Sequence, residues 1–212
     1  MSAIFLALTA VTLFGFVPAA PTDPRAVVAR YPSVQGATTV GETFNLVSII
    51  FSVASYLALY QALRPRSLVP AVWGTGLSLL GLGVSAVEAV PRIAFGHLSD
   101  LYRSPGLRVD DQTTVALIWQ ATQGMFSQFD TAATIFLTTG YVVLGMAMFW
   151  SPAFGRKFGG AAMLVGIGGL IGIYLLGINS LLFAPLGLFV LIVLPTLIGL
   201  RTYRLSFATE PG

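Results

Sequence analysis

Long runs of apolar side chains dominate the chain, and their length limits what it can fold into. A helix needs about 20 apolar residues to cross the roughly 30 Å hydrocarbon core of a bilayer. Six candidate spans follow one another along the sequence: 2–17, 43–63, 69–90, 130–150, 158–177 and 180–200. The first is short, but no basic residue precedes its apolar core, which favours a retained helix over a signal peptide. The predicted fold is an all-α polytopic membrane bundle of six transmembrane helices, one domain covering residues 1–212.

Composition supports a membrane environment and removes several classes of function. Only 9% of the residues are charged, against about a quarter in a typical soluble domain. The lysine and arginine residues are scattered between the apolar runs and form no large basic cluster, so nucleic-acid binding is not expected. The chain has no cysteine, which excludes disulfides and thiolate metal sites.

The basic residues between the spans predict the orientation in the membrane. Cations lie in short turns or at the tail on one side of the membrane: Arg64, Arg66, Arg156, Lys157, Arg201 and Arg204. On the other side, the predicted long loops 18–42 and 91–112 mix arginines with aspartates, and the turn around Asn179 has no charge. Short basic loops stay in the cytoplasm, so both termini are expected to be cytoplasmic.

Residues 113–150 form an unbroken helical pattern that is too long for one span. A helix over this whole range would measure about 57 Å at 1.5 Å per residue, nearly twice the hydrocarbon thickness. We expect an extramembrane helix near 113–129 that continues into the 130–150 span. A membrane-surface helix that turns at Gly124 is the alternative.

Small and hydroxylated residues recur every three or four positions along the four central candidate helices. This spacing keeps one face of each helix toward a neighbour, and close packing of small side chains holds membrane helices together. The positions expected to pack include Gly81, Ser85, Thr134, Thr138, Gly166 and Gly169. These four helices should form the core, with the first and last helices at its periphery.

Glu88 and Arg92 are charges at the end of an otherwise apolar run. They are four residues apart, so they share the packed face of the helix and suit an ion pair. Pro91 has no N–H for the carbonyl of Val87 and is expected to kink or end the helix. One interpretation is an ion pair that closes the helix at the outer interface. The other is a proton- or anion-binding site.

Three further polar residues are candidates for a ligand-binding or structural cluster with this pair. Asp130 is expected where the long helix enters the bilayer, with Gln123 two turns before it. Asp130 either faces Glu88 and Arg92 across the bundle or contacts lipid headgroups. His97 is expected in a loop outside the hydrocarbon. A single histidine with no neighbouring ligands predicts neither a metal site nor a haem, so no cofactor is expected, and a bound lipid or pigment stays open.

Three motifs also occur in a known family: LALYQALRP at Leu57–Pro65, VEA at Val87–Ala89 and GMAMFWSPAFGRKFGG at Gly145–Gly160. In these the chain resembles the bacterial six-helix membrane proteins grouped as domain of unknown function 4386. The resemblance implies a six-helix bundle in the bacterial cytoplasmic (inner) membrane and no assigned reaction. The 18–42 segment and the stretch HLSDLYRSPG depart from that pattern.

The leading functional hypothesis is a non-catalytic integral membrane protein, an accessory or scaffold subunit of a membrane complex. The expected partners are membrane lipids together with other membrane subunits or further copies of the chain. The alternative is a small transporter or ligand-binding membrane protein that uses Glu88, Arg92 and Asp130 at the outer leaflet. An enzyme ranks third, because Glu88 and His97 could act as an acid–base pair only if the loop folded back over the bilayer.

Overall fold

A computed structural model describes residues 2–16, 23–177 and 193–208, and within these ranges every regular element is a helix. The helices are α1 Ser2–Phe16, α2 Pro24–Leu63, α3 Leu68–Tyr102, α4 Val109–Phe149, α5 Gly155–Leu176 and α7 Leu194–Ala208. Four are long and apolar enough to cross a membrane, namely α2, α4, α5 and the part Leu68–Glu88 of α3. The all-helical fold is confirmed for these ranges. The candidate span 180–200 falls partly outside the described residues.

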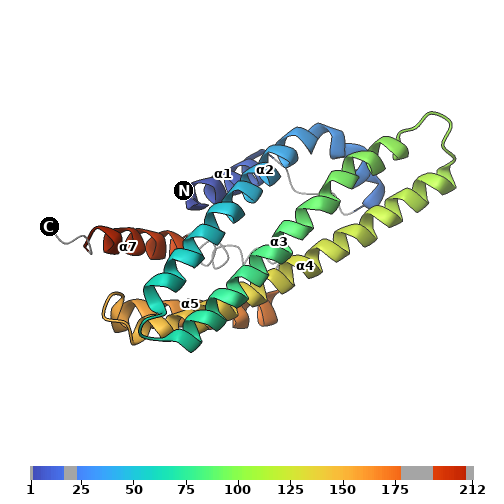
Figure 1. The fold of residues 1–212 in the computed structure, drawn as a ribbon. Coiled ribbons are helices and arrows are strands. Elements are labelled where there is room, and N and C mark those ends of the chain that lie inside the picture. Colours follow the sequence, from blue (N-terminus) through green and yellow to red (C-terminus); the bar gives the residue numbers. More distant parts are fainter. Residues whose placement is uncertain (1, 17–22, 178–192, 209–212) are drawn as a thin grey trace.

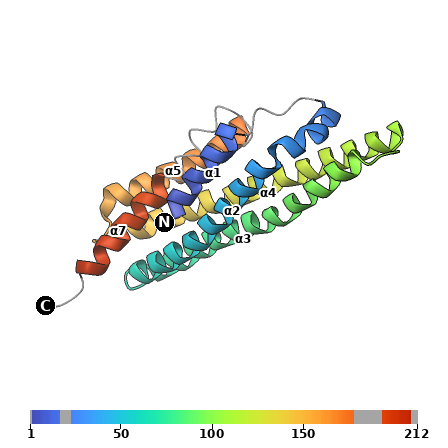
Figure 2. The same ribbon diagram turned by 90° about the horizontal axis from the view of Figure 1, so that it is seen from above.

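The three longest helices, α2, α3 and α4, run side by side in an up-down-up arrangement (Figure 1). α3 packs against both α2 and α4, and α5 packs along α4. α1 and α7 contact α2. Figure 2 shows that α1, α5 and α7 lie along only one half of the long helices, so the other half is built from α2, α3 and α4.

α2 starts nineteen residues before the predicted span at Thr43, so most of the predicted 18–42 loop is wrong. Asp23 caps the helix by accepting a hydrogen bond of 3.1 Å from the backbone N–H of Arg25, and Pro24 occupies the first turn. An aspartate cap followed by proline is a standard start signal, because proline lacks an N–H that would be unpaired there. Pro32 lies inside the helix without ending it.

α3 continues through Pro91 to Tyr102, so most of the predicted loop 91–112 is wrong as well: only residues 103–108 connect α3 to α4, and His97 lies on a helix. Beyond Pro91 the helix is held by aromatic packing. Phe95 lies 4.3 Å from Trp119 and 5.0 Å from Phe126 between ring centroids. A proline inside a helix costs about 3 kcal/mol, and burial of several aromatic rings can offset it.

α4 is one continuous helix of 41 residues, so the alternative with a turn at Gly124 is wrong. At 1.5 Å per residue it is about 61 Å long, twice the thickness of the hydrocarbon core. Its first part joins α2 and α3 in the half of the molecule that α5 does not cover (Figure 2). The 113–129 segment is thus an extension of the spanning helix.

Small residues allow the helices to approach closely. A Cβ added to Gly81 would lie 2.8 Å from the carbonyl oxygen of Ala133, and one added to Gly166 would lie 2.6 Å from that of Thr138. Thr134, Thr138 and Gly169 are buried. Because these contacts involve backbone atoms, α3 and α5 pack against α4 at distances that only residues without a side chain permit.

Candidate functional site

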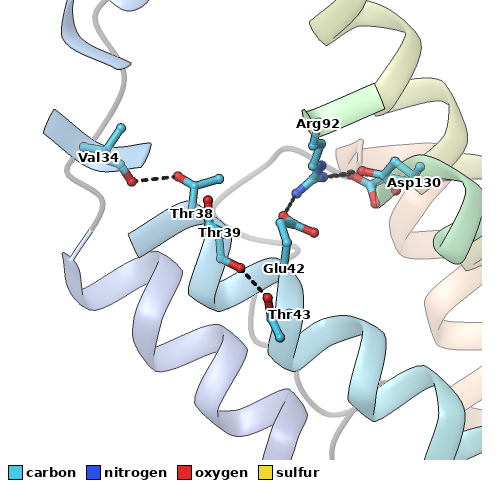
Figure 3. Close-up of polar contacts among 8 residues, drawn as sticks. Val34, Thr38, Thr39, Glu42, Thr43, Arg92 and Asp130 are labelled. Atoms are coloured by element: carbon cyan, nitrogen blue, oxygen red, sulfur yellow. Dashed lines mark hydrogen bonds and ion pairs between the residues drawn. The ribbon is translucent and has the colours of Figure 1, made fainter. Parts of the chain in front are cut away.

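Arg92 of α3 lies between acidic residues from three helices (Figure 3). Its guanidinium donates hydrogen bonds to Oε1 of Glu42 on α2 and to Oε1 of Glu88 one turn earlier on α3. Oδ2 of Asp130 on α4 lies 3.9 Å from Arg92 Nη2. The Phe126 ring lies 5.6 Å from the guanidinium carbon, within cation–π range. We call Glu42, Glu88, Arg92 and Asp130 the charge layer.

The charge layer is largely shielded from solvent. The side chains of Glu88, Glu42 and Arg92 are 5%, 12% and 25% exposed, whereas Asp130 is 46% exposed. Buried charges are tolerated only when they are paired and hydrogen-bonded. One guanidinium faces three carboxylates, so the layer carries a formal charge of −2 when every group is ionised.

The position of the charge layer along the helices fits one bilayer thickness. Glu42 lies 21 residues before Leu63, Glu88 lies 20 residues after Leu68, and Asp130 lies 19 residues before Phe149. About 20 helical residues span roughly 30 Å, which equals the hydrocarbon core. If the turns after Leu63 and Phe149 lie at one membrane surface, the charge layer lies at the other.

Basic residues gather at the end of the bundle opposite the charge layer. Those at this end are Arg64, Arg66, Arg156, Lys157 and Arg201, whereas Arg25, Arg30, Arg103 and Arg108 lie at the other end, beyond the charge layer and among the acidic residues. Arg201 of α7 donates a hydrogen bond of 3.0 Å to the carbonyl of Ala153, which ties α7 to the turn between α4 and α5. Every acidic residue in the described ranges lies in the charge layer or beyond it. This charge asymmetry is typical of a membrane protein with its basic end in the cytoplasm.

A cavity of about 140 Å³ extends from the charge layer into the bundle. Its walls come from α1, α2, α3, α4 and α7, and its polar lining is Asn45, Ser48, Ser52, Tyr56, Ser85, Glu88, Arg92, Asp130, Thr134 and Tyr141. The cavity wall also includes Tyr56 of α2 and Tyr141 of α4, whose ring centroids are 6.3 Å apart. Along these two helices they are the lining residues furthest from Arg92. The site is therefore a polar chamber with charges at one end and phenols at the other.

Two residues predicted for this cluster lie apart from it. His97 and Gln123 are exposed, and neither makes a hydrogen bond or ion pair to another residue in the described ranges. The α4 residue that contacts Arg92 is Phe126, not Gln123. On α3 beyond Arg92, the buried side chain is Phe95, not His97. The pair of Glu88 with His97 considered for acid–base chemistry is therefore not formed.

Glu42 belongs to the site, although the predicted 18–42 loop placed it outside the spanning helices. The signal was present, because Glu42 precedes Asn45, Ser48 and Ser52 at steps of three or four residues. That spacing places all four on one face of a helix, and Asn45, Ser48 and Ser52 line the cavity. Extending the candidate span backward from Thr43 would have included the second acidic partner of Arg92.

The described residues contain no group of three or more histidine, aspartate or glutamate side chains placed to hold a metal ion. The carboxylates, the hydroxyls and the Asn45 amide of the chamber can bind a ligand non-covalently.

In comparisons with protein-family models, with curated proteins and with solved structures, no match to this chain was found. The resemblance to the domain 4386 family therefore stays a prediction.

Proposed function

We propose that the chain is a non-catalytic integral membrane protein that serves as an accessory or scaffold subunit of a membrane complex. In this proposal it crosses the bacterial inner membrane six times and keeps both termini in the cytoplasm. The four apolar helices and the basic end opposite the charge layer support this placement.

The observation that carries the proposal is a groove along the exposed side of α3. The groove has a volume of about 800 Å³, and its lining is apolar: Val72, Trp73, Gly76, Leu77, Leu79, Leu80, Gly83, Val84, Val87 and Phe129. Gly76 and Gly83 are seven residues apart, so both lie on the same face of the helix. A Cβ added at either position would meet no described atom within 4 Å.

The two other glycines nearby on α3 behave differently. A Cβ at Gly74 would lie 2.7 Å from Leu144 and one at Gly81 would lie 2.8 Å from Ala133, so these glycines already serve the contact with α4. Glycine in a membrane helix lets another backbone come close. The open pair, Gly76 and Gly83, therefore suits the docking of a transmembrane helix from another subunit.

Filling the groove should separate the chain from its complex without unfolding it. In the double variant Gly76→Leu/Gly83→Leu, the new side chains occupy the space of the incoming helix. The tagged full-length chain, extracted from its native membrane in mild detergent, should run as a larger assembly for the wild type than for this variant in size-exclusion chromatography. Gly160→Leu is the matched control, because Gly160 on α5 also has no described atom within 4 Å of an added Cβ.

A wild-type chain that runs alone would count against the accessory role, and so would an assembly that the groove variant leaves intact. Expression in an unrelated bacterium distinguishes the occupant. A second copy of the chain would still assemble there. We expect the wild-type chain to run alone in that host, because its partner is another subunit that the host lacks.

A further inference from the structure

The cavity below the charge layer contains polar groups that the fold itself does not use. Most hydroxyls of the bundle bond back to the carbonyl four residues earlier, as Ser55 does to Phe51 at 2.9 Å and Ser78 does to Gly74 at 2.9 Å. Ser52 and Ser85 line the cavity and make no hydrogen bond to any described residue. A polar chamber inside a helix bundle does not stay dry, so these groups contact either water or a ligand.

The charge of the chamber indicates the sign of a ligand. Arg92 alone would favour an anion, which is one of the two ligands that the sequence suggests. Glu42, Glu88 and Asp130 all lie around this single guanidinium, so its charge is more than compensated. Asp130 has the longest link to Arg92, at 3.9 Å, and the most exposed side chain of the four. Its carboxylate is the one best able to accept hydrogen bonds from an incoming cation.

The size and lining of the chamber limit the ligand further. Its volume of about 140 Å³ is well below the roughly 300–1,000 Å³ of sites for drug-sized molecules. It would hold about four or five waters at roughly 30 Å³ each, or one molecule of a few non-hydrogen atoms. Leu82, Ala133 and Leu137 also line it, so part of the wall is apolar. A ligand with a charged end and a short apolar body matches both parts.

We propose that this chamber binds a small primary alkylammonium ion. The ammonium group donates its three N–H groups to Asp130, Glu88 and the free hydroxyl of Ser85, and the alkyl part lies against Leu82 and Leu137. The site does not depend on the proposed accessory role, because the groove of α3 lies on the outer side of the bundle and is tested separately.

Isothermal titration calorimetry of the full-length chain in detergent tests the site, with n-propylammonium chloride as the probe. The expected result is saturable binding of one ion per chain. 1-Propanol, which has the same size and no charge, should give no saturable heat. Sodium chloride at the same ionic strength should neither bind nor displace the probe.

Two variants locate the binding. Asp130→Asn should weaken the affinity for propylammonium at least tenfold, whereas Asp100→Asn, an exposed carboxylate paired with Arg103 outside the chamber, should leave it unchanged. Ser85→Leu fills the chamber without altering its charge and should abolish binding, and Thr43→Leu on the exposed face of α2 is its control.

Equal binding of 1-propanol, displacement of the probe by sodium, or no saturable heat from the wild type would each overturn the proposal. These three comparisons need no variant, so they decide even if a substitution prevents folding. Wild-type affinity in Ser85→Leu would place the ion elsewhere and would equally overturn it.

Discussion

Arg92→Met should lower the free energy of unfolding by on the order of 3 kcal/mol, because it leaves buried carboxylates without their cation. Methionine keeps most of the length and apolar contact of the arginine side chain, so the loss reports mainly the missing charge. Glu42 and Glu88 would then remain 12% and 5% exposed with no guanidinium between them. Unfolding in mixed detergent micelles of increasing SDS content, followed by circular dichroism, measures the change.

Arg103→Met is the control for this experiment. Arg103 pairs with Asp100 at 3.1 Å, but both side chains are about half exposed or more. Such a surface pair contributes about 1 kcal/mol or less. Adding Glu42→Gln and Glu88→Gln to Arg92→Met should recover part of the stability, since it removes the unpaired anions. If Arg92→Met cost no more than Arg103→Met, the charge layer would not hold the three helices together.

Gly159→Ala and Gly160→Ala should have opposite effects although the two residues are adjacent on α5. A Cβ at Gly159 would lie 2.4 Å from the backbone nitrogen of Phe149 and 2.6 Å from the carbonyl oxygen of Gly145, so α5 must move away from α4. A Cβ at Gly160 would meet no described atom within 4 Å.

Overpacking of this kind costs about 1–3 kcal/mol, and more when backbone atoms must shift. Alanine at the open position should gain up to about 1 kcal/mol from its higher helix propensity. The same SDS titration should therefore separate the two variants by about 3 kcal/mol. Equal stabilities would show that the close approach of α4 and α5 at Gly145 and Gly159 is not formed.

The sequence predicts the long apolar helices and the faces on which they pack, for a simple physical reason. Lipid requires about 20 apolar residues per helix and small residues where helices touch, and both leave periodic patterns. Gly81, Thr138 and Gly166 could be placed at contacts from spacing alone. The neighbours they meet could not be derived, because spacing defines a face but not the residue opposite it.

Outside the apolar segments the predicted loops were wrong, because the helices continue where the hydropathy falls. The 24–42 part of α2 contains Pro32 and several polar residues, and α3 passes through Pro91. These segments are helical because Val28, Phe95, Trp119 and Phe126 pack together as a second hydrophobic cluster. That cluster joins residues far apart in sequence, so local propensity did not reveal it.

The misplaced start of the predicted α2 span also left Glu42 out of the predicted polar cluster. Without Glu42, the polar cluster was a nearly balanced set in which either an anion or a proton was a reasonable ligand. Glu42 adds a third carboxylate at Arg92 but does not line the chamber, where Glu88 and Asp130 with Arg92 already leave an excess of one negative charge. The span predicted from Thr43 therefore omitted one of the three carboxylates that face Arg92.

In the proposed orientation, the charge layer lies at the outer surface of the hydrocarbon, one bilayer thickness from the basic end. Single-cysteine labelling in intact bacteria with a membrane-impermeant maleimide tests this directly, because the chain has no cysteine of its own. The positions to replace lie on the exposed face of α2 above, at and below Glu42: Gln35, Thr39, Thr43, Leu46 and Ile50. Pro65, in the basic turn, is the position on the opposite side.

We expect Gln35→Cys and Thr39→Cys to react in intact cells, because they lie in water beyond the charge layer. Leu46→Cys and Ile50→Cys should be protected by lipid, and Pro65→Cys should react only after the cells are permeabilised. The transition should fall at Thr43, within one turn of Glu42. Reaction of Ile50→Cys in intact cells, or protection of Gln35→Cys, would contradict the placement of the charge layer, and reaction of Pro65→Cys in intact cells would contradict the orientation.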